Sequence, residues 1–431
     1  DRLAEEGFLP PVLLDQAPPF TNPRVEYDQA IAYKSQFLKQ AFAQFSTNIE
    51  PAIEQEFEEF CQAQSDWLAD YALFMAIKEA HNGAGWHQWD KDIAWREPEA
   101  LKVWGDRLKT EVLYHQFLQF LGFRQWQEVK AYANQRHIAI FGDLPIYVAH
   151  DSADVWANPE NFCLDPETGE AARMAGVPPD YFSITGQLWG NPVYDWETLK
   201  ATGFAWWIKR FKANLQYLDI VRIDHFRGFE SYWGVPQGEK TAENGEWYPA
   251  PGKEFFQALG KALGDDLPLV AEDLGVITPE VEALRDEFNF PGMKVLHFAF
   301  DSDRDNPFLP YNYSNGNAVV YTGTHDNDTT VGWFQERSEE DQQKVINYLG
   351  CVCNEGIHWS LIRLASSSVA ALAIFPLQDI LGLGGDCRMN LPGTAMGNWG
   401  WRYHPDQLND WLSGHLSFIT ELYGRRIYHT D

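Results

Sequence analysis

The sequence predicts an α/β fold built on a parallel sheet, on the strength of two observations. Short apolar runs rich in β-branched residues recur at long intervals after residue 136, and helical patterns separate several of them. Polar residues follow each apolar run at once. Continuous apolar strands that alternate with helices are typical of a parallel sheet covered by helices on both faces. With 45% hydrophobic residues among 431, the chain can bury a large core.

The first part of the chain, residues 1–136, is expected to form a mainly helical subdomain. Apolar side chains recur there at helical spacing, which predicts amphipathic helices. Pro51 is placed to open one helix, and Ser65 is a plausible N-cap for the next. The expected helices span residues 27–45, 52–62, 66–80, 106–120 and 125–135. Their apolar stripes are interpreted as packing faces.

The second part, residues 137–431, is expected to form the catalytic strands and helices. The predicted strands are residues 137–141, 218–223, 267–271, 294–300, 318–321 and 369–375. Helices are predicted over 206–216, 254–263, 279–287 and 339–348, and a long loop insertion over 151–196. We interpret the pattern as a (β/α)8 TIM-type barrel with large, mainly helical insertions. Since only six strands are visible, we expect the first two barrel strands to be missing from this chain.

Charge and cysteine content exclude several classes of protein. The formal net charge of −29 disfavours binding to nucleic acid or to an anionic membrane surface. No stretch approaches the roughly 18 apolar residues of a membrane span, and no signal peptide is predicted at the N-terminus. Five cysteines are too few for a disulfide scaffold, so we expect a cytoplasmic protein, or a stromal one in a photosynthetic eukaryote. Cys351 and Cys353 lack a second Cys/His pair, so no metal is expected there.

Aromatic residues make up 15% of the chain, with 18 Trp, 18 Tyr and 28 Phe. Such rings suit sugars, whose faces carry C–H groups while their rims carry hydroxyls. They also suit an aromatic-rich core, and composition by itself favours the core. Rings between residues 151 and 196 are nevertheless expected to stack on sugars and to cover a cleft. These rings are Trp156, Tyr181, Phe182, Trp189, Tyr194 and Trp196.

Carboxylates stand at the ends of four predicted strands, namely Asp143, Asp224, Glu272 and Asp326. In a parallel barrel the catalytic groups cluster where strands end. A lone aspartate at a strand end usually caps a helix, but four in the same position indicate a site. Carboxylates without a serine or cysteine nucleophile motif suit the chemistry of glycosidic bonds. Arg222 lies two residues before Asp224 and therefore on the same face of its strand, where its charge favours an ionised nucleophile.

Seven motifs together resemble those of the amylomaltase family, the 4-α-glucanotransferases or disproportionating enzymes of the α-amylase clan. The motifs are GDLPIYV at 142–148, GQLWGNPVY at 186–194, VRIDHFRG at 221–228, VAEDLG at 270–275, THDN at 324–327, RMNLPG at 388–393 and GNW at 397–399. The resemblance covers essentially the whole chain. Ordinary α-amylases carry an Asn-His pair after the first strand-end aspartate, so the Leu-Pro that follows Asp143 favours the glucanotransferase branch.

The resemblance implies an activity and a set of roles. Segments of α-1,4-glucan would pass between maltooligosaccharides by a retaining double displacement through a covalent glycosyl-enzyme, with no cofactor and no metal. Asp224 would be the nucleophile, Glu272 the general acid/base and Asp326 the carboxylate that stabilises the transition state. Substrate would be contacted by Asp143, Trp189, Arg222, His225, His325 and Asn390. The expected partners are maltooligosaccharides and α-glucans, and the oligomeric state stays open.

Three other interpretations remain open at the level of sequence. A retaining α-glucan hydrolase would use the same three carboxylates, since only the fate of the glycosyl-enzyme differs. A metal-dependent hydrolase could use His225 and His325 with their neighbouring aspartates, although no His-x-His pattern follows the first strand. A non-catalytic glucan-binding protein would use the aromatic rings for binding, with the carboxylates only accepting hydrogen bonds.

Overall fold

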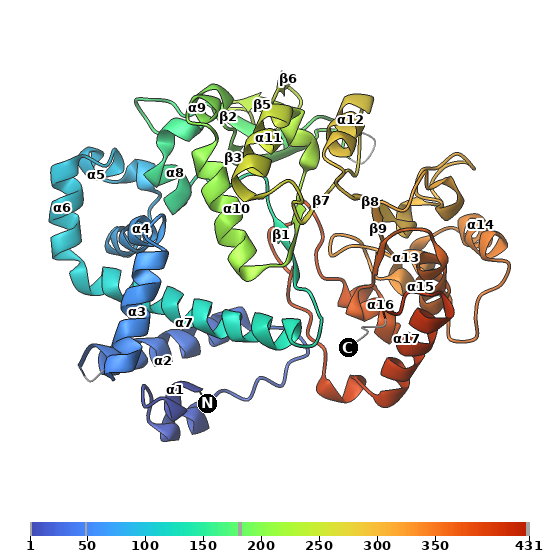
Figure 1. The fold of residues 1–431 in the computed structure, drawn as a ribbon, viewed down its shortest axis with the longest axis horizontal. Coiled ribbons are helices and arrows are strands. Elements are labelled where there is room, and N and C mark those ends of the chain that lie inside the picture. Colours follow the sequence, from blue (N-terminus) through green and yellow to red (C-terminus); the bar gives the residue numbers. More distant parts are fainter. Residues whose placement is uncertain (1, 48–49, 180–182, 428–431) are drawn as a thin grey trace. The chain divides into compact units, whose positions relative to one another are not determined.

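The chain folds into two compact units, described from a computed structural model of residues 2–47, 50–179 and 183–427 (Figure 1). The first unit comprises Asp1–Ala17 and Ala32–Phe288, and the second comprises Pro18–Ile31 and Asn289–Asp431. The expected boundary after residue 136 falls inside the first unit.

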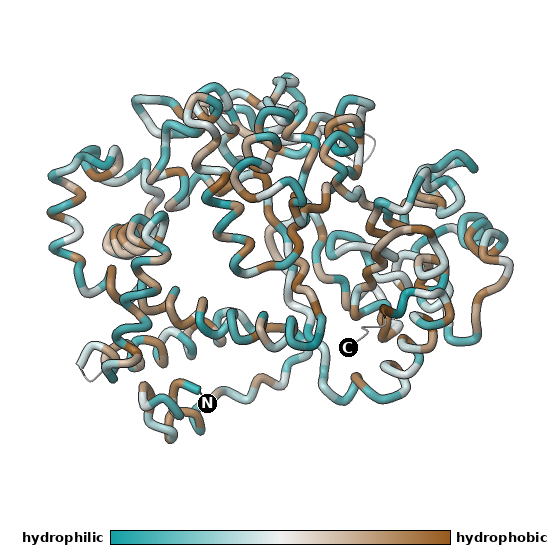
Figure 2. Tube along the Cα trace, viewed as in Figure 1, coloured by the Kyte–Doolittle hydropathy of each residue, from teal (hydrophilic) through white to brown (hydrophobic). Residues whose placement is uncertain are grey.

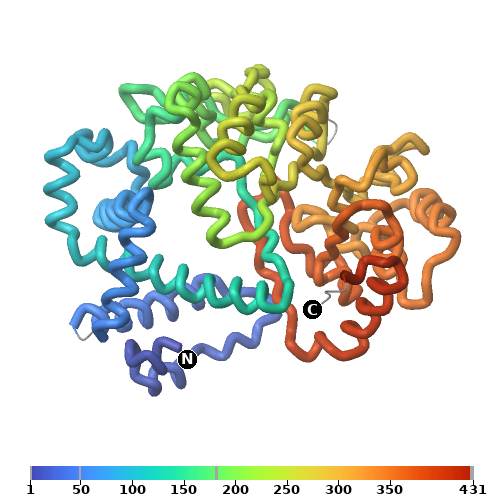
Figure 3. Tube along the Cα trace, in the orientation of Figure 1, coloured from blue at the N-terminus to red at the C-terminus, as the bar shows by residue number. Residues whose placement is uncertain are grey.

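Helices dominate the start of the chain, as predicted. They are α1 (Arg2–Glu5), α2 (Tyr27–Thr47), α3 (Pro51–Ala63), α4 (Leu68–Ala80), α5 (Lys91–Ala94), α6 (Pro98–Arg107) and α7 (Lys109–Asn134). Helices α2, α3 and α7 lie in the blue to cyan part of the trace (Figure 3). Phenylalanines from these three helices build a core in which the ring of Phe45 lies 4.6 Å from that of Phe117, centroid to centroid. The apolar stripes are therefore packing faces. Most residues of helix α4 up to Ile77 are hydrophobic, so the helix is mainly brown in Figure 2.

Two details of the helical prediction were wrong. The helix expected at 106–120 begins in the end of α6, and from Lys109 on it forms one helix, α7, with the helix expected at 125–135. The two are continuous because Leu121 is buried against the phenylalanine core and the helix continues past it. Ser65 does not cap α4, which begins at Leu68 with Trp67 in the N-cap position. Residues 64–67 form a turn between α3 and α4.

The first unit contains a three-stranded parallel sheet. Its strands are β1 (Phe141–Leu144), β4 (Ile220–Ile223) and β7 (Leu269–Ala271), in the order β1-β4-β7. Helices α10 (Ala205–Tyr217) and α11 (Gly252–Leu263) precede β4 and β7, and α12 (Pro279–Glu287) follows β7. The register pairs Asp143 with Arg222 and Ile223 with Ala271, so the three strands end side by side.

The first strand begins four residues later than expected. His137 adopts a left-handed conformation with φ of 57° at the end of α7, which turns the chain before β1 begins. Asp143 consequently lies within β1 rather than after it. The carboxylate of Asp143 still lies at the expected edge of the sheet, because the register places Asp143 opposite Arg222.

A four-stranded antiparallel sheet, which the sequence analysis missed, also belongs to the first unit. Its order is β3-β2-β5-β6, with strands β2 (Arg173–Val177), β3 (Gln187–Pro192), β5 (Ser231–Pro236) and β6 (Glu246–Pro249). Residues 151–196 are therefore not only a loop, since they contain α8 (Ala153–Ala157), β2 and β3, with α9 (Trp196–Ala201) starting at their end. Glycine and proline interrupt the apolar alternation of these strands, which hides them from a periodicity search.

The second unit contains another three-stranded parallel sheet, in the order β10-β9-β8. The strands are β8 (Gly292–Val295), β9 (Ala318–Tyr321) and β10 (Leu372–Ile374). Around it lie α13 (Thr330–Glu336), α14 (Glu339–Leu349), α15 (Ile357–Ser367), α16 (Leu377–Leu381) and α17 (Asp410–Leu422). The strand predicted over 294–300 ends at Val295, because Leu296–Phe298 form a turn of 3-10 helix.

The α/β class is confirmed, and all six predicted parallel strands are present within the described residues. The parallel strands occur in two sheets of three, and no parallel strand precedes β1 in the part of the chain that the structure describes. Among those same residues, no helix is both long and apolar enough to cross a membrane. All five cysteines are free thiols.

Candidate active site

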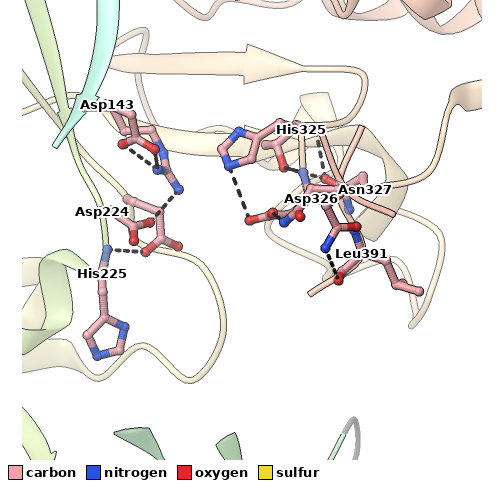
Figure 4. Close-up of polar contacts among 12 residues, drawn as sticks. Asp143, Asp224, His225, His325, Asp326, Asn327 and Leu391 are labelled. Atoms are coloured by element: carbon pink, nitrogen blue, oxygen red, sulfur yellow. Dashed lines mark hydrogen bonds and ion pairs between the residues drawn. The ribbon is translucent and has the colours of Figure 1, made fainter. Parts of the chain in front are cut away.

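Arg222 is the centre of the first group of candidate residues. It projects from β4, where its Nη1 lies 2.7 Å from both carboxylate oxygens of Asp143 on β1. Its Nη2 lies 3.0 Å from Oδ1 of Asp224, so one guanidinium links two carboxylates (Figure 4). Arg222 is only 8% exposed. Burial works against its charged form, but Asp143, Asp224 and Glu272 more than offset this, so the pKa of Arg222 is raised.

Glu272 follows β7 directly and is held by two backbone amides. The N–H of His225 donates to Oε2 at 2.8 Å, and the N–H of Leu274 donates to Oε1 at 2.9 Å. Burial raises the pKa of Glu272 to about 7, aided by the negative charge of Asp224 and opposed by Arg222. The carboxyl group can therefore exchange a proton near neutral pH, as a general acid or base must.

His225 contacts both Glu272 and the indole of Trp189. Its left-handed backbone, with φ of 50°, accompanies the hydrogen bond from its N–H to Glu272. Burial lowers the pKa of His225 to about 4, so its imidazole is neutral near pH 7. The indole of Trp189 on β3 stands edge to face against that imidazole at 4.9 Å and is 37% exposed. A neutral imidazole and an exposed indole together suit hydroxyl-bearing ligands.

The second group of candidate residues lies in the second unit, after β9. Asn390 donates from Nδ2 to Oδ1 of Asp326 at 2.6 Å, and Nε2 of His325 lies 3.5 Å from Oδ2 (Figure 4). Arg388 donates to the backbone carbonyl of Asp326 at 2.6 Å. Trp399 lies 5.3 Å from the His325 ring. The Asp326 carboxylate is thus held on both oxygens while its side chain stays 43% exposed.

Every candidate residue predicted from the sequence falls into one of these two groups. The first contains Asp143, Trp189, Arg222, Asp224, His225 and Glu272, and the second contains His325, Asp326 and Asn390. Arg388 and Trp399 were missed as site residues. Both lie in the motifs at 388–393 and 397–399, so a signal existed, but only the folded loop reveals their contacts with Asp326 and His325.

Among the rings expected to line a cleft, three of the four that the structure describes are core residues instead. Trp156, Tyr194 and Trp196 are buried, so the expectation that they stack on sugars is wrong. Their polar atoms explain why they fit inside, since the Tyr194 hydroxyl donates to the Ile146 carbonyl and the Trp156 indole donates to that of Ile93. Trp189 stays available at the surface. Tyr181 and Phe182 lie outside the described residues.

Metal ligation finds no support among these side chains. Within the described ranges, no group of three or more histidine, cysteine, aspartate or glutamate residues is arranged to hold a metal ion. Cys353 instead donates from its Sγ to the carbonyl of Gly356 at 3.1 Å.

An α/β scaffold with an arginine-linked aspartate beside a glutamate that titrates near neutral pH is typical of enzymes that cleave or form glycosidic bonds. The chain belongs to the 4-alpha-glucanotransferase family, whose model matches residues 3–409. The family resemblance of the motifs is thereby confirmed. The chain is an enzyme, a glycosyltransferase acting on α-1,4-glucans.

Individual relatives agree with this assignment. A 4-alpha-glucanotransferase of Synechocystis sp. is 96% identical over 431 residues, which make up 100% of this chain and 85% of the relative. One from Thermus thermophilus is 49% identical over 425 residues, covering 97% of this chain and 84% of the relative. The solved structure of an amylomaltase from Streptococcus agalactiae in complex with acarbose matches with a TM-score of 0.94 at 38% identity, over 99% of this chain and 85% of that one.

Proposed function

We propose that this chain transfers α-1,4-glucan segments between maltooligosaccharides by double displacement with retention, using Asp224 as nucleophile and Glu272 as general acid/base. The observation that carries the proposal is that these two carboxyl groups follow the ends of β4 and β7, which are paired neighbours in one parallel sheet. Their environments differ, since Asp224 contacts the Arg222 guanidinium while burial raises the pKa of Glu272 to about 7. Two carboxyl groups in contrasting environments are what an acid and a nucleophile require.

In the first step Asp224 attacks the anomeric carbon of the donor glucan. A bond forms between the Asp224 oxygen and that carbon, and the glycosidic bond breaks. The proton of Glu272 goes to the departing 4-oxygen, so the released glucan leaves as a neutral alcohol. Arg222 holds Asp224 from one side, which fixes the direction of attack.

In the second step the 4-hydroxyl of an acceptor glucan replaces Asp224. Glu272 takes the hydroxyl proton, the acceptor oxygen bonds to the anomeric carbon, and Asp224 leaves as a carboxylate. Esterification removes the negative charge of Asp224, which is one cause of the high pKa of Glu272. The pKa of Glu272 is therefore expected to fall in the intermediate, which converts the acid into a base when a base is needed.

The remaining candidate residues would bind the sugar. We assign Asp326 to hydroxyl binding and transition-state stabilisation, supported by the bond from Asn390 that leaves part of the carboxylate exposed. His325, His225, Asp143 and Arg222 are assigned to donor contacts. Trp189 is the exposed ring suited to stacking on a glucose face, and good acceptor placement would favour transfer over hydrolysis.

The architecture of the catalytic part is also a proposal. We assign the six parallel strands to a (β/α)8 TIM-type barrel, with residues 1–136 as a helical insertion and 137–431 as the catalytic part. The chain order of strands and helices supports it, as does the strand-end position of the carboxylates. The free cysteines support a reducing, cytoplasmic location.

Incubation of purified protein with maltotriose tests the function. Transfer gives glucose and a ladder of longer maltooligosaccharides with little change in total reducing ends, whereas hydrolysis raises reducing ends with each bond broken. Asp224→Asn is expected to lower both rates by about 10³-fold or more, because no covalent intermediate forms. Asp266→Asn, a change in an exposed loop carboxylate, is the matched control and should leave transfer unchanged. Full activity of Asp224→Asn would refute the assignment of the nucleophile.

A further inference from the structure

One buried carboxylate of the second unit has no part in the chemistry proposed above. Asp379 lies on the short helix α16 and is fully buried. Its Oδ2 accepts hydrogen bonds from the hydroxyls of Thr322 at 2.5 Å and Thr330 at 2.7 Å, and its Oδ1 accepts from the N–H of Thr330 at 2.7 Å. A buried carboxylate is costly unless its hydrogen bonds are made, so these contacts bind it firmly to two points of the chain.

The two threonines enclose the segment that carries the candidate site residues. Thr322 follows β9 directly, and Thr330 is the first residue of α13. Both are fully buried. The segment between them contains His325 and Asp326, so Asp379 holds the loop at its beginning and at its end through side-chain bonds to a single carboxylate.

A histidine and a glycine pack this arrangement closely. His297 is buried, and burial lowers its pKa to about 3, so its ring is neutral. Since the Thr330 hydroxyl donates to Asp379, its oxygen is free to accept from Nε2 of His297, which lies 3.0 Å away. At Gly323, a Cβ would lie 2.7 Å from the His297 ring, so the backbone of the loop runs directly against it. Trp333 stacks on the same ring at 4.5 Å.

The neighbouring residue on α16 holds the other segment that meets Asp326. Gln378 is buried and donates to the carbonyl of Cys387 at 3.2 Å. Three residues further on, Asn390 donates to Oδ1 of Asp326 at 2.6 Å. Consecutive side chains of one short helix thus anchor both the loop that carries Asp326 and the loop that bonds to its carboxylate.

We propose that Asp379 is a positioning residue for glucan transfer, which fixes the placement of Asp326 through its hydrogen bonds to Thr322 and Thr330. The inference rests on the role proposed for Asp326. It predicts that loosening the anchor lowers the turnover number of enzyme that remains folded, because a carboxylate that stabilises a transition state must be held to within a fraction of an ångström.

The test removes a hydrogen bond to Asp379 without creating a cavity in the core. Thr330→Val keeps the shape and the backbone bond to Asp379 but removes the hydroxyl that bonds to Oδ2. We expect kcat for maltotriose transfer to fall by about 10- to 100-fold with KM within about twofold. Thr330→Ser restores the hydroxyl and should recover kcat to within about threefold. Ser360→Ala, which removes a buried hydroxyl bonded to Cys353 and Gly356 in the same unit, is the matched control and should keep kcat.

Folded enzyme is quantified by thermal unfolding and circular dichroism, and kcat is expressed per folded molecule well below the unfolding temperature. A purely structural role would lower the folded fraction but leave that kcat unchanged, and this result would overturn the proposal. Thr322→Val removes the hydrogen bond at the other end of the loop, and its kcat is measured per folded molecule as well. It replaces Thr330→Val as the test if that variant does not fold. Asp326→Asn separates the two proposals. If it loses activity while Thr330→Val and Thr322→Val keep theirs, only the positioning role fails, whereas full activity of Asp326→Asn overturns the role of Asp326 and the inference together.

Discussion

Arg222 shows how a single side chain sets the electrostatics of the first candidate cluster. Its guanidinium contacts Asp143 and Asp224. Its positive charge also lowers the pKa of Glu272, which burial raises. Because arginine stays charged under all relevant conditions, it keeps the carboxylates together without taking part in proton exchange. The side-chain alternation of a strand was enough to predict that Arg222 and Asp224 share one face.

The protonation of Glu272 gives a prediction for pH dependence. A general acid must carry its proton in the free enzyme, and the pKa of Glu272 is about 7. The protonated fraction falls as pH rises through that value, so kcat/KM for maltotriose should decline above a pH of about 7, by about tenfold per pH unit. Initial rates across a pH series measure this limb. A flat profile up to a pH of about 9 would contradict the assignment of Glu272 as the acid.

Removal of the Arg222 charge should shift the alkaline limb of the pH profile. Arg222 lowers the pKa of Glu272, so its loss in Arg222→Met leaves Glu272 protonated to higher pH. We expect kcat to fall by about 10- to 100-fold, because Asp224 loses its partner, and the alkaline limb to shift upward. Arg124→Met is the control, because Arg124 also forms ion pairs with two carboxylates, Glu6 and Glu56, and its side chain is 15% exposed against 10% for Arg222, but it lies on α7. An unchanged limb in Arg222→Met would show that the two groups are not coupled.

At the scale of single elements, burial decides how much a glycine matters. Gly252 opens α11 with its Cα against the Phe229 carbonyl, where a Cβ would lie 2.3 Å from that oxygen. Gly122 lies in the middle of α7, and nothing approaches its Cβ position within 4 Å. The same residue type therefore serves close packing in one helix and only weakens the other.

These two glycines give opposite predictions for stability. Gly252→Ala should lower the free energy of unfolding by about 1–3 kcal/mol, because α11 must shift away from a backbone carbonyl. Gly122→Ala should raise it by about 0.5–1 kcal/mol, because alanine loses less backbone entropy in a helix. Urea unfolding followed by circular dichroism measures both changes. If the two substitutions have the same sign, the packing described for α11 is wrong.

At the scale of the whole molecule, the strands of the two parallel sheets differ in how well they are shielded from water. In each sheet the central strand is largely buried, as Val221 of β4 and Val320 of β9 show. Near the outer strands β1 and β10, by contrast, Ile138 is 56% exposed, Val369 62% and Leu372 38%. Apolar side chains and backbone at these strands are therefore more accessible to water than those at the sheet centres.

This difference predicts the pattern of hydrogen exchange. Amides of β4 should exchange more slowly than those of β1, and amides of β9 more slowly than those of β10, by about tenfold or more, since terminal strands open more easily than central ones. Exchange of purified protein, followed by mass spectrometry of peptic peptides, measures the ratios within each sheet. Equal protection of β1 and β4 would show that further chain or a partner covers the β1 edge.

Sequence by itself determined most of the helices, the parallel strands and the chain positions of the candidate carboxylates. The strand of residues 318–321 and the helix of residues 279–287 were predicted with their observed bounds, because apolar periodicity reports directly which side chains are buried. The strand-end carboxylates were found for the same reason, since a polar residue that follows an apolar run marks the end of a buried strand. Seven motifs together indicated the family.

Only the tertiary structure decided the contacts between residues far apart in the chain. The antiparallel sheet that carries Trp189 stayed hidden because its short strands are stabilised by pairing with each other rather than by a local apolar pattern. The exposure of Trp189 and the burial of Trp156 are equally invisible to composition. The pKa of Glu272 and the anchoring of Thr322 and Thr330 by Asp379 depend on burial and on partners from other elements. Such properties arise when packing excludes water, and packing is a property of the folded chain rather than of any segment.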